Sequence, residues 1–293
     1  MTAHLAYTSL MKPWEKRLRW KRAKRNLIWI SLLVFVWLMC SAQAAAASLT
    51  ERQQAFPKWS GKPSVEVSEG DLVYPQWMAG DWLMESTLVD MVAPLAPEIV
   101  TPGFEGNRQF LDQSIPAAIR FISKSVPKGR FLNQPVATNA DGDDIQIVSD
   151  RAFNGLSLAR AYLGDDWVKA VKVDPENPNR QITFLKDNQQ LVSTVTGRKV
   201  EVPNPDAFAT TEVFQQFFRN PNGPSGDTEG TPMVYLNEVE NTTIYHKGSA
   251  SDVPMTADQM TAIYLSPQDP NYFKAKDQPV ALYRYELTFS PQN

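Results

Sequence analysis

Beyond its first 47 residues, the sequence has few side chains that could act as a catalytic nucleophile or base or as a metal ligand. The chain has one cysteine, Cys40, and two histidines, of which only His246 follows residue 47. A zinc site needs several His or Cys ligands, and a Ser-His-Asp triad would have to use His246, which no nucleophile-elbow glycine pattern accompanies. We therefore interpret His246 as a histidine at the end of a strand. A haem-ligand role is the less favoured alternative, and no other cofactor is indicated.

The charged side chains have no spacing that is specific for a site. Glu85 and Asp90 are carboxylates that an enzyme could use, but their spacing does not single them out. Residues 139–146, NADGDDIQ, lack the carboxylates that a calcium loop needs at its first and twelfth positions, and they predict a turn instead. Four arginines could surround an anionic group or lie scattered on the surface, which we favour: Arg108, Arg120, Arg151 and Arg160. The sequence therefore predicts no catalytic residue and no metal site.

The N-terminal segment has the organisation of a secretory signal. Residues 12–25 carry eight Lys or Arg, Leu27–Cys40 is an apolar run of 14 residues, and small residues follow up to Ala47. A membrane-spanning helix needs about 20 apolar residues, so the run favours a cleaved signal over a permanent anchor. Bulky side chains just before Cys40 argue against lipid attachment. We predict a signal peptide over residues 1–47 and an exported protein.

Removal of this segment leaves an acidic chain without cysteine. Eight of the 29 basic residues and one of the 32 acidic residues lie in residues 1–47, so the remainder has an excess of about ten negative charges. That charge argues against binding to nucleic acid or to anionic membrane surfaces. With no disulfide, stability must come from a hydrophobic core, which a chain of this length can supply as one domain.

Hydrophobic residues recur with period two along most of the chain, which predicts an antiparallel β protein. We expect a polar arm over residues 48–70, packed through Phe56 and Trp59, and a single domain over residues 71–293. Strands are predicted at 81–92, 116–126, 166–174, 180–187, 190–197, 198–202, 233–248 (with a bend at Glu240–Asn241) and 279–290, and a hairpin turn at Asp187–Gln190. Helices are predicted at 150–164, with Asp150 as cap and Gly164 as stop, and at 256–265; residues 211–219 fit either a strand or a helix.

The stretch YPQWMAGDWLMESTL, residues 74–88, places a glycine two residues before a tryptophan at the start of the first long strand. Gly80 permits a close backbone approach that a side chain would block, and Trp82 then points inward. Burial of such a side chain removes about 150–250 Å² from water, an upper estimate of roughly 4–6 kcal/mol. Gly80 and Trp82 could close one end of a barrel, or they could be only a strand start and a core anchor.

The Gly80-Asp81-Trp82 triplet resembles the G-x-W signature of the lipocalins and the wider calycin superfamily. The resemblance implies an antiparallel barrel that holds a ligand, and a basic residue near the last strand that packs across the tryptophan ring, for which Arg284 is the candidate. The residues expected to line or close a ligand pocket are Trp82, Met84, Phe121 and Arg284.

A second resemblance covers most of the chain after residue 47. WMAGDWLMESTL (77–88), TPGFEGNRQF (101–110) and YRYELTFS (283–290) resemble a family of uncharacterised proteins from cyanobacteria and chloroplasts, several of which are assigned to the thylakoid lumen. The resemblance implies a location in the thylakoid lumen or the periplasm, and it implies no activity.

Together these observations predict a mainly β fold: one lipocalin-like (calycin-type) barrel or curved antiparallel sheet of about 8–10 strands, with one or two peripheral helices. The first functional hypothesis is the binding of a small apolar ligand such as a pigment, a lipid or a quinone-like molecule. The alternative is a lumenal assembly or scaffold factor that contacts subunits of photosynthetic membrane complexes. A second alternative is a carboxylate-based enzyme on the same barrel.

Overall fold

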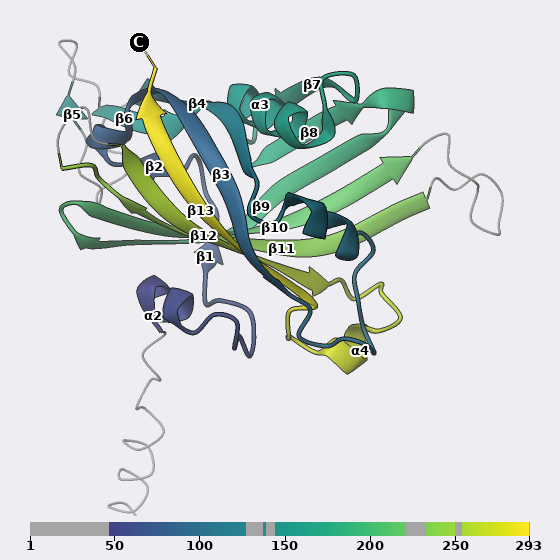
Figure 1. Cartoon of the computed structure of the whole chain (residues 1–293). Helices are drawn as coiled ribbons and strands as arrows, with labels where there is room; N and C mark the ends of the chain where they lie inside the picture. The colour runs from purple at the N-terminus through teal and green to yellow at the C-terminus, as the bar shows by residue number, and fades with distance from the viewer. Residues whose placement is uncertain (1–46, 127–136, 139–143, 221–232, 250–253, 293) are drawn as a thin grey trace, which may run out of the picture. The chain divides into compact units, whose positions relative to one another are not determined.

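The computed structural model describes residues 47–126, 137–138, 144–220, 233–249 and 254–292 (Figure 1). Ser48–Asn293 form one compact unit. All but the last residue of the signal peptide predicted over residues 1–47, and most of the turn predicted at 139–146, lie outside the described residues, and both stay predictions.

The described residues form one antiparallel sheet of 13 strands, eleven of which follow one another in a continuous order. In spatial order these are β2 (Val73–Tyr74), β6 (Asp144–Ser149), β4 (Ser114–Val126), β3 (Gly80–Val92), β13 (Ala281–Pro291), β12 (Met255–Leu265), β11 (Met233–His246), β10 (Ala207–Asn220), β9 (Gln190–Asn204), β8 (Arg180–Leu185) and β7 (Val168–Val173). Off this order, β1 (Glu66–Val67) pairs with β9, and β5 (Ala137–Thr138) pairs with β6. The sheet curls into a half-barrel (Figure 1). The predicted mainly β, curved antiparallel fold is confirmed, with more strands than the 8–10 expected.

The sheet has two differently covered faces, because successive side chains of a strand point to opposite sides. The helix α3 (Arg151–Leu163) packs against β4 near one end of the strand order and against β7 and β8 at the other, so it lies inside the curl. We call the face toward α3 the inner face and the opposite one the outer face. On β3 the inner positions Met84, Ser86 and Leu88 are buried, whereas Glu85 on the outer face is exposed.

The helix α3 has the limits that the sequence predicts. The Asp150 side chain accepts a hydrogen bond from the backbone N–H of Phe153, which stabilises the first turn. The helix ends at Gly164, whose φ of 88° is a conformation that glycine adopts without strain. These caps place α3 directly after β6, across the inside of the sheet.

The N-terminal arm covers part of the outer face. Its helix α2 (Leu49–Gln54) begins with a capping box between Ser48 and Glu51. Phe56 and Trp59 then pack on the outer face of β12 and β13, against Met260, Ala262, Tyr264 and Leu282. The predicted packing of the arm through Phe56 and Trp59 is confirmed. From there the chain forms β1 along β9 and β2 along β6, so residues 66–74 connect the two halves of the sheet.

Three predictions about local structure are wrong. The helix predicted at 256–265 is strand β12, whose inner residues Met255 and Ala257 and outer residues Met260 and Ala262 are all buried. Burial on both faces removes the polar alternation that marks a strand, and the remaining apolar spacing resembles that of a helix. The bend predicted at Glu240–Asn241 is absent, because β11 runs continuously from Met233 to His246. Residues 211–219, which fit either state, are part of strand β10.

The third error is the strand end predicted at Gly197, which lies inside the continuous strand β9. A side chain at this position would collide with Val65 of the arm, so the glycine permits the arm to cross β9. The short helices are η1 (Gln76–Met78), η2 (Glu105–Phe110), η3 (Lys186–Asn188) and α4 (Tyr272–Ala275). The turn around η3 joins β8 to β9 and confirms the hairpin predicted at Asp187–Gln190.

Candidate functional site

Three of the four residues predicted to line a ligand pocket lie together at one end of the inner face. Met84 and Phe121 belong to one buried cluster, and Trp82 packs against it. The Trp82 indole N–H donates a hydrogen bond to the Met78 carbonyl oxygen at 2.9 Å. The Phe121 ring meets the Tyr74 ring with centroids 4.8 Å apart. Side chains of the protein thus pack this end of the inner face, which we call the apolar cluster.

Gly80 has a different role from the expected one. Its φ of +126° is a conformation that residues with a side chain rarely adopt, and a Cβ at this position would meet no atom within 4 Å. The expected close approach of another backbone to Gly80 is therefore wrong. The glycine is required by the backbone conformation at the start of β3.

Arg284 lies apart from the apolar cluster. The strand register pairs Arg284 with Asp90, and Trp82 with Pro291 seven residues further along β13. Arg284 is on the outer face, where its guanidinium donates a hydrogen bond to Asp258 at 3.0 Å. The predicted packing of Arg284 across the Trp82 ring is therefore wrong, because the two side chains lie on opposite faces.

The other sequence candidates are also separate from one another. His246 is exposed at the end of β11, as predicted, and Glu85 and Asp90 are exposed. The four arginines do not gather around one group: they pair with four different carboxylates, as Arg108–Glu105, Arg120–Asp81, Arg151–Glu212 and Arg160–Asp165. Within the described part of the chain, no group of three or more His, Cys, Asp or Glu side chains could hold a metal ion.

A row of polar side chains crosses the middle of the inner face. The register aligns one residue from each of five neighbouring strands: Arg198, Glu212, Asn241, Thr261 and Tyr283. The Thr261 hydroxyl donates a hydrogen bond to Asn241 Oδ1 at 2.8 Å. This row was not found from the sequence, because the five residues come from strands that only the register brings together.

Two arginines share one carboxylate in this row. Arg151, the first residue of α3, donates to Glu212 Oε1 at 2.8 Å, and Arg198 donates to the same oxygen at 2.7 and 3.0 Å. All three side chains are largely buried. Burial alone would raise the pKa of Glu212, but the charges and hydrogen bonds of both arginines outweigh it and lower that pKa below its ordinary value. We call these three residues the Arg–Glu–Arg triad; it carries a net charge of +1.

A cavity of about 360 Å³ lies between α3 and the inner face. Its wall combines polar and apolar side chains: Ser149, Arg151, Asn154, Gly155, Leu158, Ala159, Asn179, Gln181, Thr183, Leu191, Ser193, Phe214, Gln216 and Asn241. We call it the α3 cavity. Its volume falls at the lower end of the range of about 300–1,000 Å³ that is typical of small-molecule sites.

Several polar groups of the α3 cavity have no partner within the described residues. The Gln181 side chain makes no hydrogen bond there, and the Asn241 amide uses only its oxygen. Asn237 lies opposite the cavity residue Gln216, and its buried Oδ1 has no hydrogen-bond partner among the described residues. An unpaired polar group is costly where it is buried, as Asn237 Oδ1 is. The Gln181 and Asn241 amides are half-buried in the cavity wall and keep donors that a polar molecule could use.

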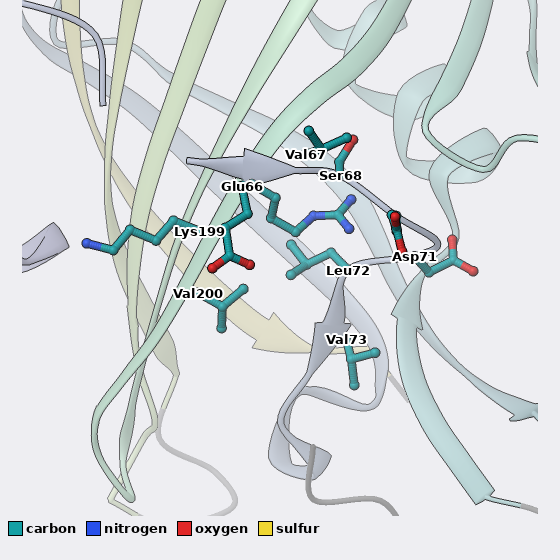
Figure 2. A pocket seen from close by; sticks show the side chains of 10 residues that line it. Glu66, Val67, Ser68, Asp71, Leu72, Val73, Lys199 and Val200 are labelled. Carbon is teal, nitrogen blue, oxygen red and sulfur yellow. The ribbon is translucent and has the colours of Figure 1, made fainter. Parts of the chain in front are cut away.

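A second hollow, of about 660 Å³, lies between residues 66–73 and β9 (Figure 2). Figure 2 shows the Leu72 side chain, just before β2, extending towards Val200 of β9, while the Lys199 side chain points away from the other labelled residues. Arg198 of the triad lines this cleft, and Arg151 lines the α3 cavity. The Arg–Glu–Arg triad therefore lies between the two hollows.

Residues 66–293 match the model of a protein family described as "Domain of unknown function (DUF6816)". The chain belongs to this family. Neither the comparison with curated proteins nor the comparison with solved structures found a match. The matched region contains every residue of the α3 cavity and of the triad, whereas α2 and Arg52 of the arm precede it.

None of the helices in the described residues has both the length and the apolar character that crossing a membrane requires.

Proposed function

We propose that this protein binds a small organic molecule in the α3 cavity. The observation that carries the proposal is a cavity inside a curled sheet whose wall contains unpaired hydrogen-bonding groups at Gln181, Asn241 and Arg151. Sites of this kind are concave and use a few convergent polar groups to orient the ligand.

The chemical character of the wall defines the kind of ligand. Leu158, Leu191 and Phe214 supply apolar surface, and the polar groups lie beside them. The purely apolar pigment, lipid or quinone-like ligand expected from the sequence suits the apolar cluster, but side chains of the protein pack that region. The α3 cavity suits a molecule with an apolar body and polar substituents.

The scaffold alternative has one surface feature in its favour. No strand of the described residues pairs with the free edge of β9 beyond Arg198, and Val67, Val200 and Val202 are exposed beside it. This edge also carries Pro203, which has no N–H to donate, and the charged Lys199 and Glu201. These features discourage pairing with a further strand, so the cavity supports ligand binding better than the edge supports docking.

We also propose that the protein works after export, in the thylakoid lumen or the periplasm. The signal-like residues 1–47 and the family resemblance support this location. Cleavage after Ala44 or after Ala47 fits the sequence equally well, and the compact unit begins at Ser48, directly after the second of these sites. N-terminal sequencing of the protein purified from its own organism should give a chain that begins at or near Ser48; an intact N-terminus would contradict export by cleavage.

The binding proposal is tested by native mass spectrometry of the protein purified from its own organism. We expect a co-purifying organic molecule at near-unit stoichiometry. Gln181→Trp fills the α3 cavity without breaking a hydrogen bond of the described residues, and it should abolish the bound mass. Lys169→Trp, at an exposed position of β7 outside the cavity, is the matched control and should retain it.

Two results of this experiment would contradict the proposal. A molecule that stays bound in the Gln181→Trp variant would place the site elsewhere. A ligand-free protein whose only companions are subunits of a membrane complex would favour the scaffold alternative.

A further inference from the structure

We propose that the ligand of the α3 cavity carries a carboxylate group and that Arg151 binds it. This inference rests on the proposed function and specifies its substrate class. It follows from the charge of the Arg–Glu–Arg triad, from the unused donors of Arg151 and from the surroundings of its guanidinium.

The charge of the triad is unbalanced inside the half-barrel. Arg151 and Arg198 have one common carboxylate, Glu212, and the side chain of Arg151 is only 15% exposed. Asp71 is the next acidic group whose charge raises the pKa of Arg151. Its carboxylate already accepts a hydrogen bond of 2.6 Å from the Lys124 ammonium group. Tyr74 also faces the triad. Its pKa is raised mainly by burial and further by the nearby Tyr245 and Glu212 side chains, so the Tyr74 hydroxyl stays neutral. One buried positive charge therefore lacks a counter-charge, and such charges require a partner.

The two arginines differ in the donors that they have left. Arg198 donates to Glu212, to Asn179 Oδ1 at 2.8 Å and to the Gly70 carbonyl oxygen at 3.3 Å. Arg151 makes a single hydrogen bond within the described residues, through one Nη atom to Glu212. A guanidinium has five N–H donors, so Arg151 keeps most of its donors available, and the residue is part of the cavity wall.

The geometry of a guanidinium selects a carboxylate among the possible polar groups. Its planar, fork-like array of N–H groups binds both oxygens of a carboxylate at once. Asn241 and Gln181 of the same wall carry amide N–H groups that have no partner in the described residues and add further donors. Leu158, Leu191 and Phe214 would contact the apolar body of the molecule. The cavity thus fits a small organic acid.

The test uses matched pairs of acids and their uncharged amides as probes: phenylacetate and phenylacetamide, hexanoate and hexanamide, indole acetate and indole acetamide. Ligand-observed NMR titrations of the purified protein would measure each affinity. We expect the acids to bind about tenfold or more tightly than the amides, because charge-assisted hydrogen bonds are roughly twice as strong as neutral ones. Loss of binding in Gln181→Trp assigns each probe to the α3 cavity.

Two variants examine the role of Arg151. Arg151→Met leaves Glu212 paired with Arg198, so the fold should persist, and the preference for acids over amides should disappear. Arg151→Lys keeps the charge without the fork and should retain part of the preference. Arg160→Met removes a charge from the same helix outside the cavity and should leave every affinity unchanged. Near-ultraviolet circular dichroism confirms that each variant is folded.

The outcomes separate this inference from the proposed function. If amides bind in the α3 cavity as tightly as acids, or if Arg151→Met keeps the preference, the carboxylate inference is wrong while the binding function stands. If Gln181→Trp abolishes the binding of none of the probes and of no co-purifying molecule, the carboxylate inference and the proposed binding function are both wrong.

Discussion

The contact between Arg52 and Glu240 offers the strongest test of how the arm is held on the sheet. Glu240 lies on the outer face of β11 with 0% of its side chain exposed. Arg52 of α2 donates two hydrogen bonds of 2.6 Å to its two carboxylate oxygens, and the Tyr264 hydroxyl donates one of 2.8 Å. The Arg52 guanidinium also lies 4.0 Å from the centre of the Trp59 ring. Arg52 is the one cation that pairs with Glu240 in the described residues.

Arg52→Met would remove the counter-charge and keep most of the apolar length of the side chain. Loss of one partner of a buried ion pair costs about 3–5 kcal/mol, because the remaining charge stays desolvated. The lost contact with the Trp59 ring adds about 0.5–1 kcal/mol. We therefore expect the free energy of unfolding to fall by about 3.5–6 kcal/mol.

Urea denaturation followed by fluorescence measures this free energy by linear extrapolation. Arg108→Met is the matched control, since its partner Glu105 is exposed and solvent-screened pairs of this kind contribute little to stability. The double variant Arg52→Met/Glu240→Gln should recover much of the loss, because a buried amide costs less than a buried charge. If Arg52→Met is no more destabilising than Arg108→Met, the ion pair does not hold the arm and the reasoning is refuted.

Three further predictions concern Gly80, Trp82 and Glu212. Gly80→Ala should destabilise by about 1–3 kcal/mol because of its positive φ, whereas Gly61→Ala, at an open position without that φ, should be near neutral in the same urea assay. Trp82→Ala should cost about 3–5 kcal/mol by thermal and urea unfolding; a neutral effect would contradict its packing against the apolar cluster. The folded state lowers the pKa of Glu212 below 4.5, so the unfolded state protonates first and the triad's stabilisation is lost as the pH falls below about 4.5. The wild type should therefore lose stability more steeply in acid than Glu212→Gln does, and equal slopes would show that the triad does not lower this pKa.

Local sequence signals predicted the elements whose causes are local. Asp150 and Gly164 mark the ends of α3, because helix caps depend on hydrogen bonds and backbone angles a few residues apart. The alternation of Met84 and Ser86 with Glu85 on β3 likewise predicts a strand with one buried face. Residues 256–265 show where this reasoning fails, since burial on both faces of β12 depends on the arm and on the inner cluster.

The candidate site could not be predicted in the same way. Arg151 and Glu212 are 61 residues apart, and Arg198 joins them only because β9 pairs with β10 in one particular register. On β10 the sequence places Glu212 and Val213 on opposite faces, but it does not say which face meets α3. Arg284 was assigned to the wrong face for the same reason.

The sequence by itself determined a mainly β chain with period-two strands, one well-capped helix and an aromatic arm, since propensity, caps and alternation act over a few residues. Only the tertiary structure decided which face of each strand is the inner one. Curling of the sheet around α3 buries the Arg–Glu–Arg triad and forms the wall of the α3 cavity. Strand register and the packing of α3 are long-range interactions, and they convert scattered polar residues into a site.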